Sequence, residues 1–205
     1  MKIFVTGIGT GVGKTVVSAV FVEALGADYW KPVQAGDLEA SDTATVRQLV
    51  SRRDVVFHPN AFALHTPASP HYSAALDGVR ITLESMVEPQ TERSLVIEGA
   101  GGVMVPINET HTFLDFIRPD YKVVLVSMNY LGSINHTLMT YEVLKNSGAD
   151  CLGLVFNGEA NTSTEELIVS KTGLEVIGRI NREPLWTQET VRRYAEQFNR
   201  NFFKA

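Results

Sequence analysis

The chain has 205 residues, and 44% of them are apolar, which is enough to bury a core and too many for a disordered segment. Its 18 Lys and Arg and 23 Asp and Glu give a formal net charge of −5, which argues against a nucleic-acid-binding protein with a basic face. A single cysteine excludes an internal disulfide and a cysteine metal cluster, and no run approaches the roughly 18–20 apolar residues of a membrane span. We therefore expect one cytoplasmic domain over residues 1–205, without nucleic-acid or membrane partners.

Short apolar runs rich in β-branched residues alternate along the chain with longer segments of helical pattern. The expected strands cover residues 3–6, 29–33, 94–98, 122–127, 152–156 and 176–180. The expected helices cover residues 14–25 (ended by Gly26), 42–53 (capped by Ser41), Ser133 or Asn135 to Lys145 (ended by Gly148), a segment with Ser163 and Glu166 as its capping box, and 187–203.

This alternation predicts an α/β fold, a three-layer and doubly wound sheet that is mostly parallel. The strands are apolar nearly throughout, as expected for strands covered on both faces, and ligands of such sheets bind at the carboxyl ends of the strands. Residues 55–79 are the least regular part, and we interpret them as a structured excursion from the sheet, such as a lid or a substrate loop. The last helix carries an apolar stripe that we expect to pack on the core or on a partner subunit, formed by Val191, Tyr194, Ala195, Phe198 and Phe202.

A glycine-rich loop, Gly7-Ile-Gly-Thr-Gly-Val-Gly-Lys-Thr15, joins the first expected strand to the first helix. Glycines let backbone N–H groups turn toward an anion, and the helix N-terminus adds its positive dipole end, so the fold is predicted to be of the P-loop NTPase type. Lys14 would reach the β- and γ-phosphates and the Thr15 hydroxyl would ligate Mg²⁺. The spacing departs from the general pattern, because Ile8 stands where its first glycine is expected. The residues expected to bind ATP in this loop are Gly9, Thr10, Gly11, Val12, Gly13, Lys14, Thr15 and Val16.

A second cluster, Leu95-Val-Ile-Glu-Gly-Ala-Gly-Gly102, contains an acidic residue at the end of an expected buried strand. Glu98 is placed there to hold Mg²⁺, directly or through water, and the glycines beyond it allow close approach of a substrate. Alone, an acid at a strand end is usually just solvated. Together with the phosphate loop it indicates an enzyme that uses a nucleotide.

Six motifs follow one another along the chain: Gly7-x5-Gly13-Lys14-Thr15, Lys31-Pro32-Val33-Gln34, Ser41-Asp42, Ser69-Pro70-His71, Glu98-Gly99-Ala100-Gly101-Gly102 and Leu131-Gly132-Ser133-Ile134-Asn135-His136. The same motifs recur in this order in dethiobiotin synthetases, and the chain resembles that family from residue 1 to about Asn157. The stretched phosphate loop is normal in this family.

The resemblance implies a ligase that forms C–N bonds in biotin biosynthesis. ATP, CO₂ (or bicarbonate) and 7,8-diaminononanoate would give dethiobiotin, ADP and phosphate through a carbamate and a carbamic-phosphoric anhydride. Phosphorylation turns a carbamate oxygen into a leaving group, so that the second amine closes the ring. The protein's task is mainly to position substrates and to neutralise clustered negative charge.

The resemblance also implies roles for single residues. Lys31 would act with Lys14 as a catalytic residue facing the carbamate and the γ-phosphate. Asp42 would join Thr15 and Glu98 as a ligand of Mg²⁺, and ATP would also contact Glu98 and, through adenine, Asn157. The substrate would contact Lys31, Ala35, His71, Gly101 and Gly102, and across a homodimer interface Ser133, Ile134 and Asn135.

Two positions depart from the family pattern. Ala35 stands where Thr or Ser usually holds the substrate through its hydroxyl. Asn181 stands where a Gly-x-Ile-Pro segment has its proline beside the adenine. Either change can alter substrate or base binding, whereas the residues for phosphate, Mg²⁺ and Lys31 are untouched.

Partition and cell-division ATPases, which use ATP to switch dimerisation on DNA or membrane, are the main alternative. Their phosphate loop usually carries an early second lysine, where this chain has Gly7, Ile8 and Gly9. In that case the apolar stripe of the last helix would serve as a membrane foot, with a basic side formed by Arg192, Arg193, Arg200 and Lys204. An ATP-dependent amidating synthetase for a larger ring substrate is a third reading, but it normally needs a glutaminase domain with a nucleophilic Cys, and the sequence has no suitable motif.

Overall fold

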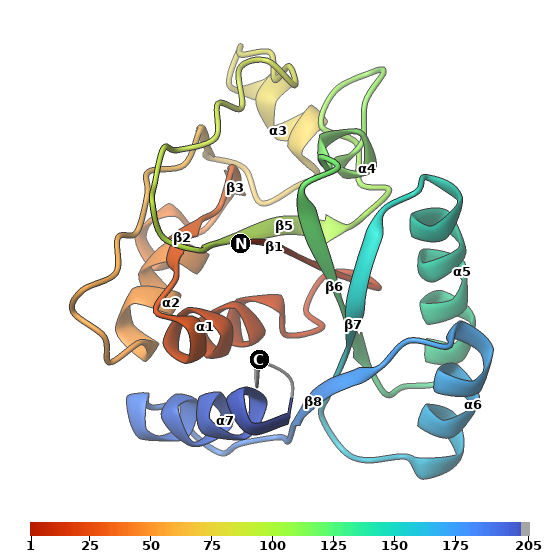
Figure 1. Ribbon diagram of the computed structural model, residues 1–205. Coiled ribbons are helices and arrows are strands. Elements are labelled where there is room, and N and C mark those ends of the chain that lie inside the picture. The colour runs from red at the N-terminus through yellow and green to blue at the C-terminus, as the bar shows by residue number, and fades with distance from the viewer. Residues whose placement is uncertain (202–205) are drawn as a thin grey trace.

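The computed structural model describes the backbone of residues 1–201 and the side chains of residues 1–198. In this part of the chain a six-stranded sheet has the order β2-β5-β1-β6-β7-β8, and its strands pair in parallel. Helices cover both faces, so the expected three-layer, doubly wound α/β fold is confirmed (Figure 1). The strands are β1 (Lys2–Gly7), β2 (Asp28–Trp30), β5 (Leu95–Gly102), β6 (Tyr121–Met128), β7 (Asp150–Asn157) and β8 (Val176–Ile180).

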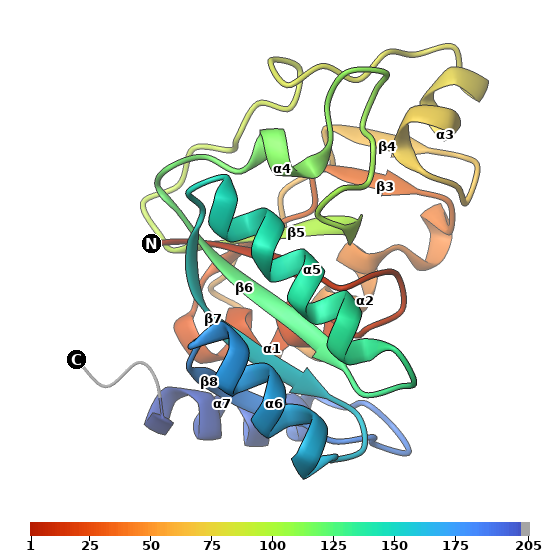
Figure 2. The ribbon, with the colours of Figure 1, turned by 90° about the vertical axis from the view of Figure 1, so that its right-hand side faces the viewer.

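The sheet divides the core into two halves. Helices α1 (Lys14–Leu25) and α7 (Gln188–Asn201) lie on one face, with α2 (Asp42–Leu49) beside α1. Helices α5 (Ser133–Asn146) and α6 (Thr162–Thr172) lie on the other, as Figure 2 shows. Neighbouring residues of β1 serve both halves, because successive side chains of a strand point to opposite faces. Val5 packs in the half formed with α1, and Phe4 packs in the other, against Phe116 of the short helix α4 (Phe113–Phe116).

The expected strand over residues 29–33 is in fact two strands. Pro32 has no N–H to donate to a ladder, and the chain leaves the main sheet at this point. Strand β3 (Val33–Ala35) then pairs with β4 (Phe62–Leu64) in a separate parallel two-stranded sheet. β4 and helix α3 (Pro70–Leu76) belong to the irregular segment 55–79, which is therefore the structured excursion that we expected (Figure 2).

Two helix boundaries differ from expectation. Ser41 caps α2 as expected, but the helix ends at Leu49 rather than at residue 53, because Glu23 binds both the backbone N–H (2.7 Å) and the hydroxyl (2.6 Å) of Ser51. The expected capping box of α6 is wrong. Asn161, rather than Ser163, accepts the capping hydrogen bond from the backbone of Thr164.

Helix α7 packs on α1 through its apolar stripe. The ring of Phe198 lies 5.7 Å from that of Phe21, and Val191, Tyr194 and Ala195 are also buried. Packing on the core is thus confirmed for these residues, and the face that a membrane foot would use is covered. Phe202 and Lys204, and the side chain of Arg200, lie outside the described residues. None of the helices described here combines the length and apolar character needed to cross a bilayer.

Candidate active site

The phosphate loop lies between the end of β1 and the start of α1. Gly11 and Gly13 have φ of 74° and 94°, which only glycine adopts without strain. Space adds a second constraint at Gly13, because a Cβ there would lie 2.1 Å from Nδ2 of Asn157. That amide donates a 2.8 Å hydrogen bond to the carbonyl of Val12, so Asn157 fixes the loop from the end of β7.

Lys14 is buried at the first position of α1, and its Nζ donates a 2.8 Å hydrogen bond back to the carbonyl of Gly9. Burial lowers the pKa of Lys14 to about 8, and the nearby charge of Lys31 lowers it as well, against the opposing effect of Glu98 and Asp42. A bound phosphate would place a negative charge next to the Lys14 amine and so favour its protonated form. The loop and Lys14 together therefore form an anion site at a helix N-terminus.

Four side chains from four parts of the chain converge beside this loop. The Thr15 Oγ1 lies 3.0 Å from Oδ1 of Asp42 and 2.9 Å from Oε1 of Glu98. The Lys31 Nζ lies 2.6 Å from Oδ2 of Asp42 and 3.2 Å from Oε1 of Glu98. Lys31 and Glu98 are almost fully buried, with exposed fractions of 3% and 1%. Burial alone would lower the pKa of Lys31, but the charges of Glu98 and Asp42 outweigh it and the pKa lies above its usual value.

Local structure explains why these groups meet. Lys31 follows β2 directly, before Pro32 turns the chain away, and Asn60 holds its carbonyl through a 2.7 Å hydrogen bond. Asp42 is the first residue of α2, and its backbone N–H donates a 3.1 Å hydrogen bond to Oε1 of Gln34. Glu98 lies in β5 between β2 and β1. We expected this strand to end at Glu98, but it continues through the glycines to Gly102.

The donor set fits a magnesium ion. Mg²⁺ takes oxygen ligands, typically one or two carboxylates completed by water and substrate phosphates. Thr15 supplies a hydroxyl, and the carboxylates of Asp42 and Glu98 each lie within hydrogen-bond distance of it. With two carboxylates and one hydroxyl, this set is not a group of three His, Cys, Asp or Glu side chains, and the described residues contain no such group that could hold a metal.

Sequence reasoning missed Tyr29, which is fully buried beneath this cluster and donates a 2.8 Å hydrogen bond to Oε2 of Glu98. In the sequence it is one more apolar residue of a strand. The available signal was its spacing, because residues 29 and 31 of an extended segment point to the same side.

A cavity of about 650 Å³ opens beside the cluster. Its walls include the phosphate loop, Lys31, Asp42 and Glu98, and also the loops that follow β3 and β4. Of the expected substrate residues, Ala35 and Gly101 line it. Outside its lining lie Gly9, Val12, Val16, Gly102 and Asn157, and also His71, whose exposed ring bonds to Ser69.

Ser133, Ile134 and Asn135 line a different groove, of about 880 Å³, between the starts of α5 and α6. Leu131, beside them, is completely exposed. Within one chain the structure therefore does not bring these three residues to the cavity that contains Lys31.

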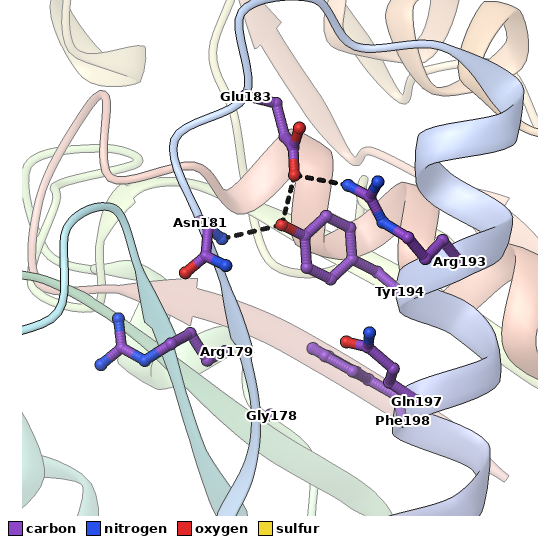
Figure 3. Close-up of a pocket in the computed structure, with 8 residues that line it drawn as sticks. All are labelled: Gly178, Arg179, Asn181, Glu183, Arg193, Tyr194, Gln197 and Phe198. Carbon is purple, nitrogen blue, oxygen red and sulfur yellow. Dashed lines mark hydrogen bonds and ion pairs between the residues drawn. The ribbon is translucent and has the colours of Figure 1, made fainter.

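The segment from Gly178 to Asn181 borders a third pocket, of about 320 Å³, against α7 (Figure 3). The backbone N–H of Asn181 donates a 3.1 Å hydrogen bond to Oη of Tyr194, which in turn donates to Glu183 at 2.5 Å. Arg193 binds the same carboxylate at 2.6 Å. A proline at this position would have no N–H to donate. Because this chain has Asn181 instead, the hydrogen bond to Tyr194 can form and anchors the loop to α7.

Comparison with known proteins agrees with this geometry. Residues 1–190 match a family profile described as an AAA domain. An ATP-dependent dethiobiotin synthetase BioD from Christiangramia forsetii is 52% identical over 197 residues, which cover 96% of this chain and 95% of that protein. The ATP-dependent dethiobiotin synthetase BioD of Cytophaga hutchinsonii is 45% identical over 205 residues and 99% of each chain. The similarity thus extends beyond the motifs to the last helix.

Solved structures share the fold at low identity. A putative plasmid partition protein from Borrelia burgdorferi bound to AMPPNP has a TM-score of 0.63 at 10% identity, over 99% of this chain and 98% of that chain. The cell division ATPase MinD of Pyrococcus furiosus has a TM-score of 0.60 at 15% identity, over 98% of this chain and 99% of that chain. At such identities the likeness concerns the fold alone.

Proposed function

The chain belongs to the dethiobiotin synthetase family, and from that premise we propose how its cavity closes the ring of 7,8-diaminononanoate with CO₂ at the expense of ATP. The enzyme is an ATP-dependent ligase of biotin biosynthesis. The observation that supports this assignment in the structure is Lys31, held between Asp42 and Glu98 beside an intact phosphate loop. We infer that all of the groups involved belong to one domain.

The reaction has three steps. One amine of the substrate adds to CO₂ and loses a proton, which gives a carbamate. A carbamate oxygen attacks the γ-phosphorus of ATP, the bond from phosphorus to the ADP oxygen breaks, and a carbamic-phosphoric anhydride forms. The second amine then attacks the carbonyl carbon, the bond to the phosphate oxygen breaks, and the ring closes with release of phosphate and a proton.

The two lysines manage negative charge during these steps. Lys14 lies at the start of α1, where the loop N–H groups receive the β- and γ-phosphates. Lys31 is close enough to Lys14 to lower its pKa and contacts Asp42 and Glu98, and it would face the γ-phosphate and the carbamate. An ammonium is a compact charge, and on its flexible stem it can follow the phosphoryl group as it moves.

Mg²⁺ would be held by Thr15, Asp42 and Glu98, and when bound it neutralises charge on the transferred phosphate. Lys31 contacts the same two carboxylates in the structure. The residues at this end of the cavity therefore carry a nearly balanced charge before ATP arrives, with Lys14 and Lys31 facing Asp42 and Glu98.

The carboxylate tail of the substrate binds to a second copy of the chain in this proposal. Ser133, Ile134 and Asn135 lie in a groove separate from the cavity, at the start of α5. The N–H of Ser133 donates to the carbonyl of Tyr130 at 2.9 Å, so the N–H groups of Ile134 and Asn135 are those that would bind a carboxylate. Replacing the fully exposed Leu131 by Glu should yield a monomer by analytical ultracentrifugation, with ATP binding retained and ring closure lost. A variant that stays dimeric and active would contradict this arrangement.

The function is tested by ADP release from Mg-ATP and bicarbonate with and without 7,8-diaminononanoate, with the product identified by mass. We expect release that depends on the diamine, and dethiobiotin as the product. An analogue with a single amine is the matched control, since it can form a carbamate but cannot close a ring. Release that is indifferent to the diamine and stimulated by DNA or lipid vesicles would instead indicate a switch ATPase.

A further inference from the structure

Asp37 is an acidic residue of the cavity wall that takes no part in the phosphate and metal cluster. It lies between β3 and the 3₁₀ turn η1 (Leu38–Ala40) and lines the same cavity as Lys31. The other acids of the lining, Asp42 and Glu98, contact Lys31 and Thr15. Within residues 1–198 the Asp37 side chain has no hydrogen bond or ion pair.

The backbone at Asp37 is in a conformation that side chains rarely adopt. Its φ is 51° and its ψ is 40°, and among the described residues it is the one non-glycine residue with a positive φ. Asp tolerates the left-handed region better than most residues, but glycine would be less strained there. Such strain in a binding site persists where the surrounding structure holds it.

The neighbouring Gly36 supplies that support. The φ of Gly36 is 78°. Its N–H donates a 2.8 Å hydrogen bond to the carbonyl of Leu64, and its carbonyl accepts a 3.0 Å hydrogen bond from the side chain of Gln34. A Cβ on Gly36 would lie 2.5 Å from Pro67, so the two loops touch at this point. The backbone at Asp37 is thereby fixed beside the loop that follows β4, and its side chain is exposed at the cavity.

Charge on this wall is otherwise missing. The other lining residues from β3 and from the loop after β4 carry no charge, and they are Gln34, Ala35, Pro67, Ala68, Ser69 and Pro70. Ala35 presents a methyl group where the family pattern has a hydroxyl. Of the charged side chains in the described lining of the cavity, Asp37 is therefore the one that makes no hydrogen bond or ion pair, and its charge is negative.

We propose that Asp37 binds the ammonium form of the amine that has not yet reacted with CO₂, and so replaces the hydroxyl that is missing at Ala35. The inference rests on the proposed function and names a substrate-binding residue within it. Because an ammonium must lose its proton before it attacks, Asp37 stabilises the bound substrate rather than the transition state. It therefore affects KM for the diamine and leaves kcat nearly unchanged.

The experiment compares Asp37→Asn with the parent chain. Asn keeps the shape and tolerates the same backbone conformation, but it has no charge. We expect KM for the diamine to rise about tenfold, since a charged hydrogen bond becomes a neutral one, while KM for ATP and kcat change less than about twofold. Titration calorimetry of the diamine without ATP should show the same loss of affinity. Glu39→Gln is the matched control, because Glu39 is an exposed acid of the same turn that does not line the cavity.

A second variant tests the strain. Asp37→Gly should lose the same affinity for the diamine and unfold at a temperature no lower than the parent, since glycine relieves the backbone. An unchanged KM for the diamine in Asp37→Asn, with normal turnover of the parent chain, would overturn the inference and leave the proposed function intact. Absence of diamine-dependent turnover in the parent chain would overturn both.

Discussion

Tyr29 donates a 2.8 Å hydrogen bond from its Oη to Oε2 of Glu98, while Oε1 of the same carboxylate faces Thr15 and Lys31. Both side chains are buried, so water does not compete for the carboxylate. Burial and the charge of Glu98 raise the pKa of Tyr29, which keeps the phenol protonated and donating. Tyr29 thus fixes the orientation of the Glu98 carboxylate by binding Oε2, so that Oε1 points to Thr15 and Lys31.

Tyr29→Phe should therefore weaken the cluster without disturbing the fold. The change removes one buried hydrogen bond, and we expect a loss of about 1 kcal/mol in the free energy of unfolding. Because Glu98 is then free to rotate, the Mg²⁺ concentration for half-maximal turnover should rise several-fold. Denaturant unfolding and a magnesium titration of the steady-state rate measure the two effects.

Tyr121→Phe is the matched control for that variant. Tyr121 is also a buried tyrosine of the main sheet, and its Oη donates 2.6 Å to Glu88, away from the candidate site. We expect a similar loss of stability with an unchanged magnesium requirement. If both variants shift the magnesium titration equally, the role assigned to Tyr29 is wrong.

Lys31→Met should lower kcat by roughly a hundredfold or more, because the variant lacks a group that stabilises charge during phosphoryl transfer. The variant also leaves Asp42 and Glu98 without the cation between them, which should cost about 2–3 kcal/mol of stability in the absence of metal. Added Mg²⁺ should recover part of that loss.

Thermal unfolding with and without Mg²⁺ checks this prediction. The midpoint of Lys31→Met should rise with Mg²⁺ by more than that of the parent chain. Lys171→Met, at an exposed position of α6, should behave like the parent in both assays. Full activity of Lys31→Met would exclude Lys31 from the reaction.

Nucleotide affinity should depend on pH through Lys14. Its pKa is about 8 in the chain without nucleotide, so the amine is charged below pH 8 and increasingly neutral above it. Phosphate favours the charged form, and binding above pH 8 must take up a proton. The Kd for ATP should therefore be constant below about pH 7.5 and rise toward tenfold per pH unit above about 8.5. Calorimetry in buffers of different ionisation enthalpy measures the proton uptake, which Lys14→Met should abolish.

Asn181→Pro should detach the loop before α7. Proline removes the N–H that binds Tyr194, and we expect a loss of about 1 kcal/mol or more in stability. Asn181→Ala keeps the backbone donor and should be nearly neutral. In combination with Tyr194→Phe, the proline variant should cost less than the sum of the two single changes, since both remove the same bond. Additive effects would show that the bond does not hold the loop.

The sequence was most informative where function depends on neighbours in the chain. The bounds of α1 and the placement of Lys14 and Thr15 follow from a glycine-rich turn and helical periodicity, both of which are local signals. The small sheet of β3 and β4 pairs residues nearly thirty positions apart, such as Val33 with Phe62, and no local pattern specifies that pairing. Asp37 was missed for the same reason, although Ala35 and the segment 55–79, which line the same cavity, were expected near the substrate.

The place of β5 between β1 and β2 also determines when the site can form during synthesis. β1 and β2 are not neighbours, and each pairs with β5 instead. A nascent chain that emerges N-terminus first exposes the phosphate loop and Lys31 well before Gly102 completes β5. Until then Lys31 lacks Glu98 and the two early strands lack a common partner. The cluster of Thr15, Lys31, Asp42 and Glu98 is therefore complete only after β5 is inserted between β2 and β1, and only then can Mg²⁺ and ATP bound at this cluster stabilise the folded chain.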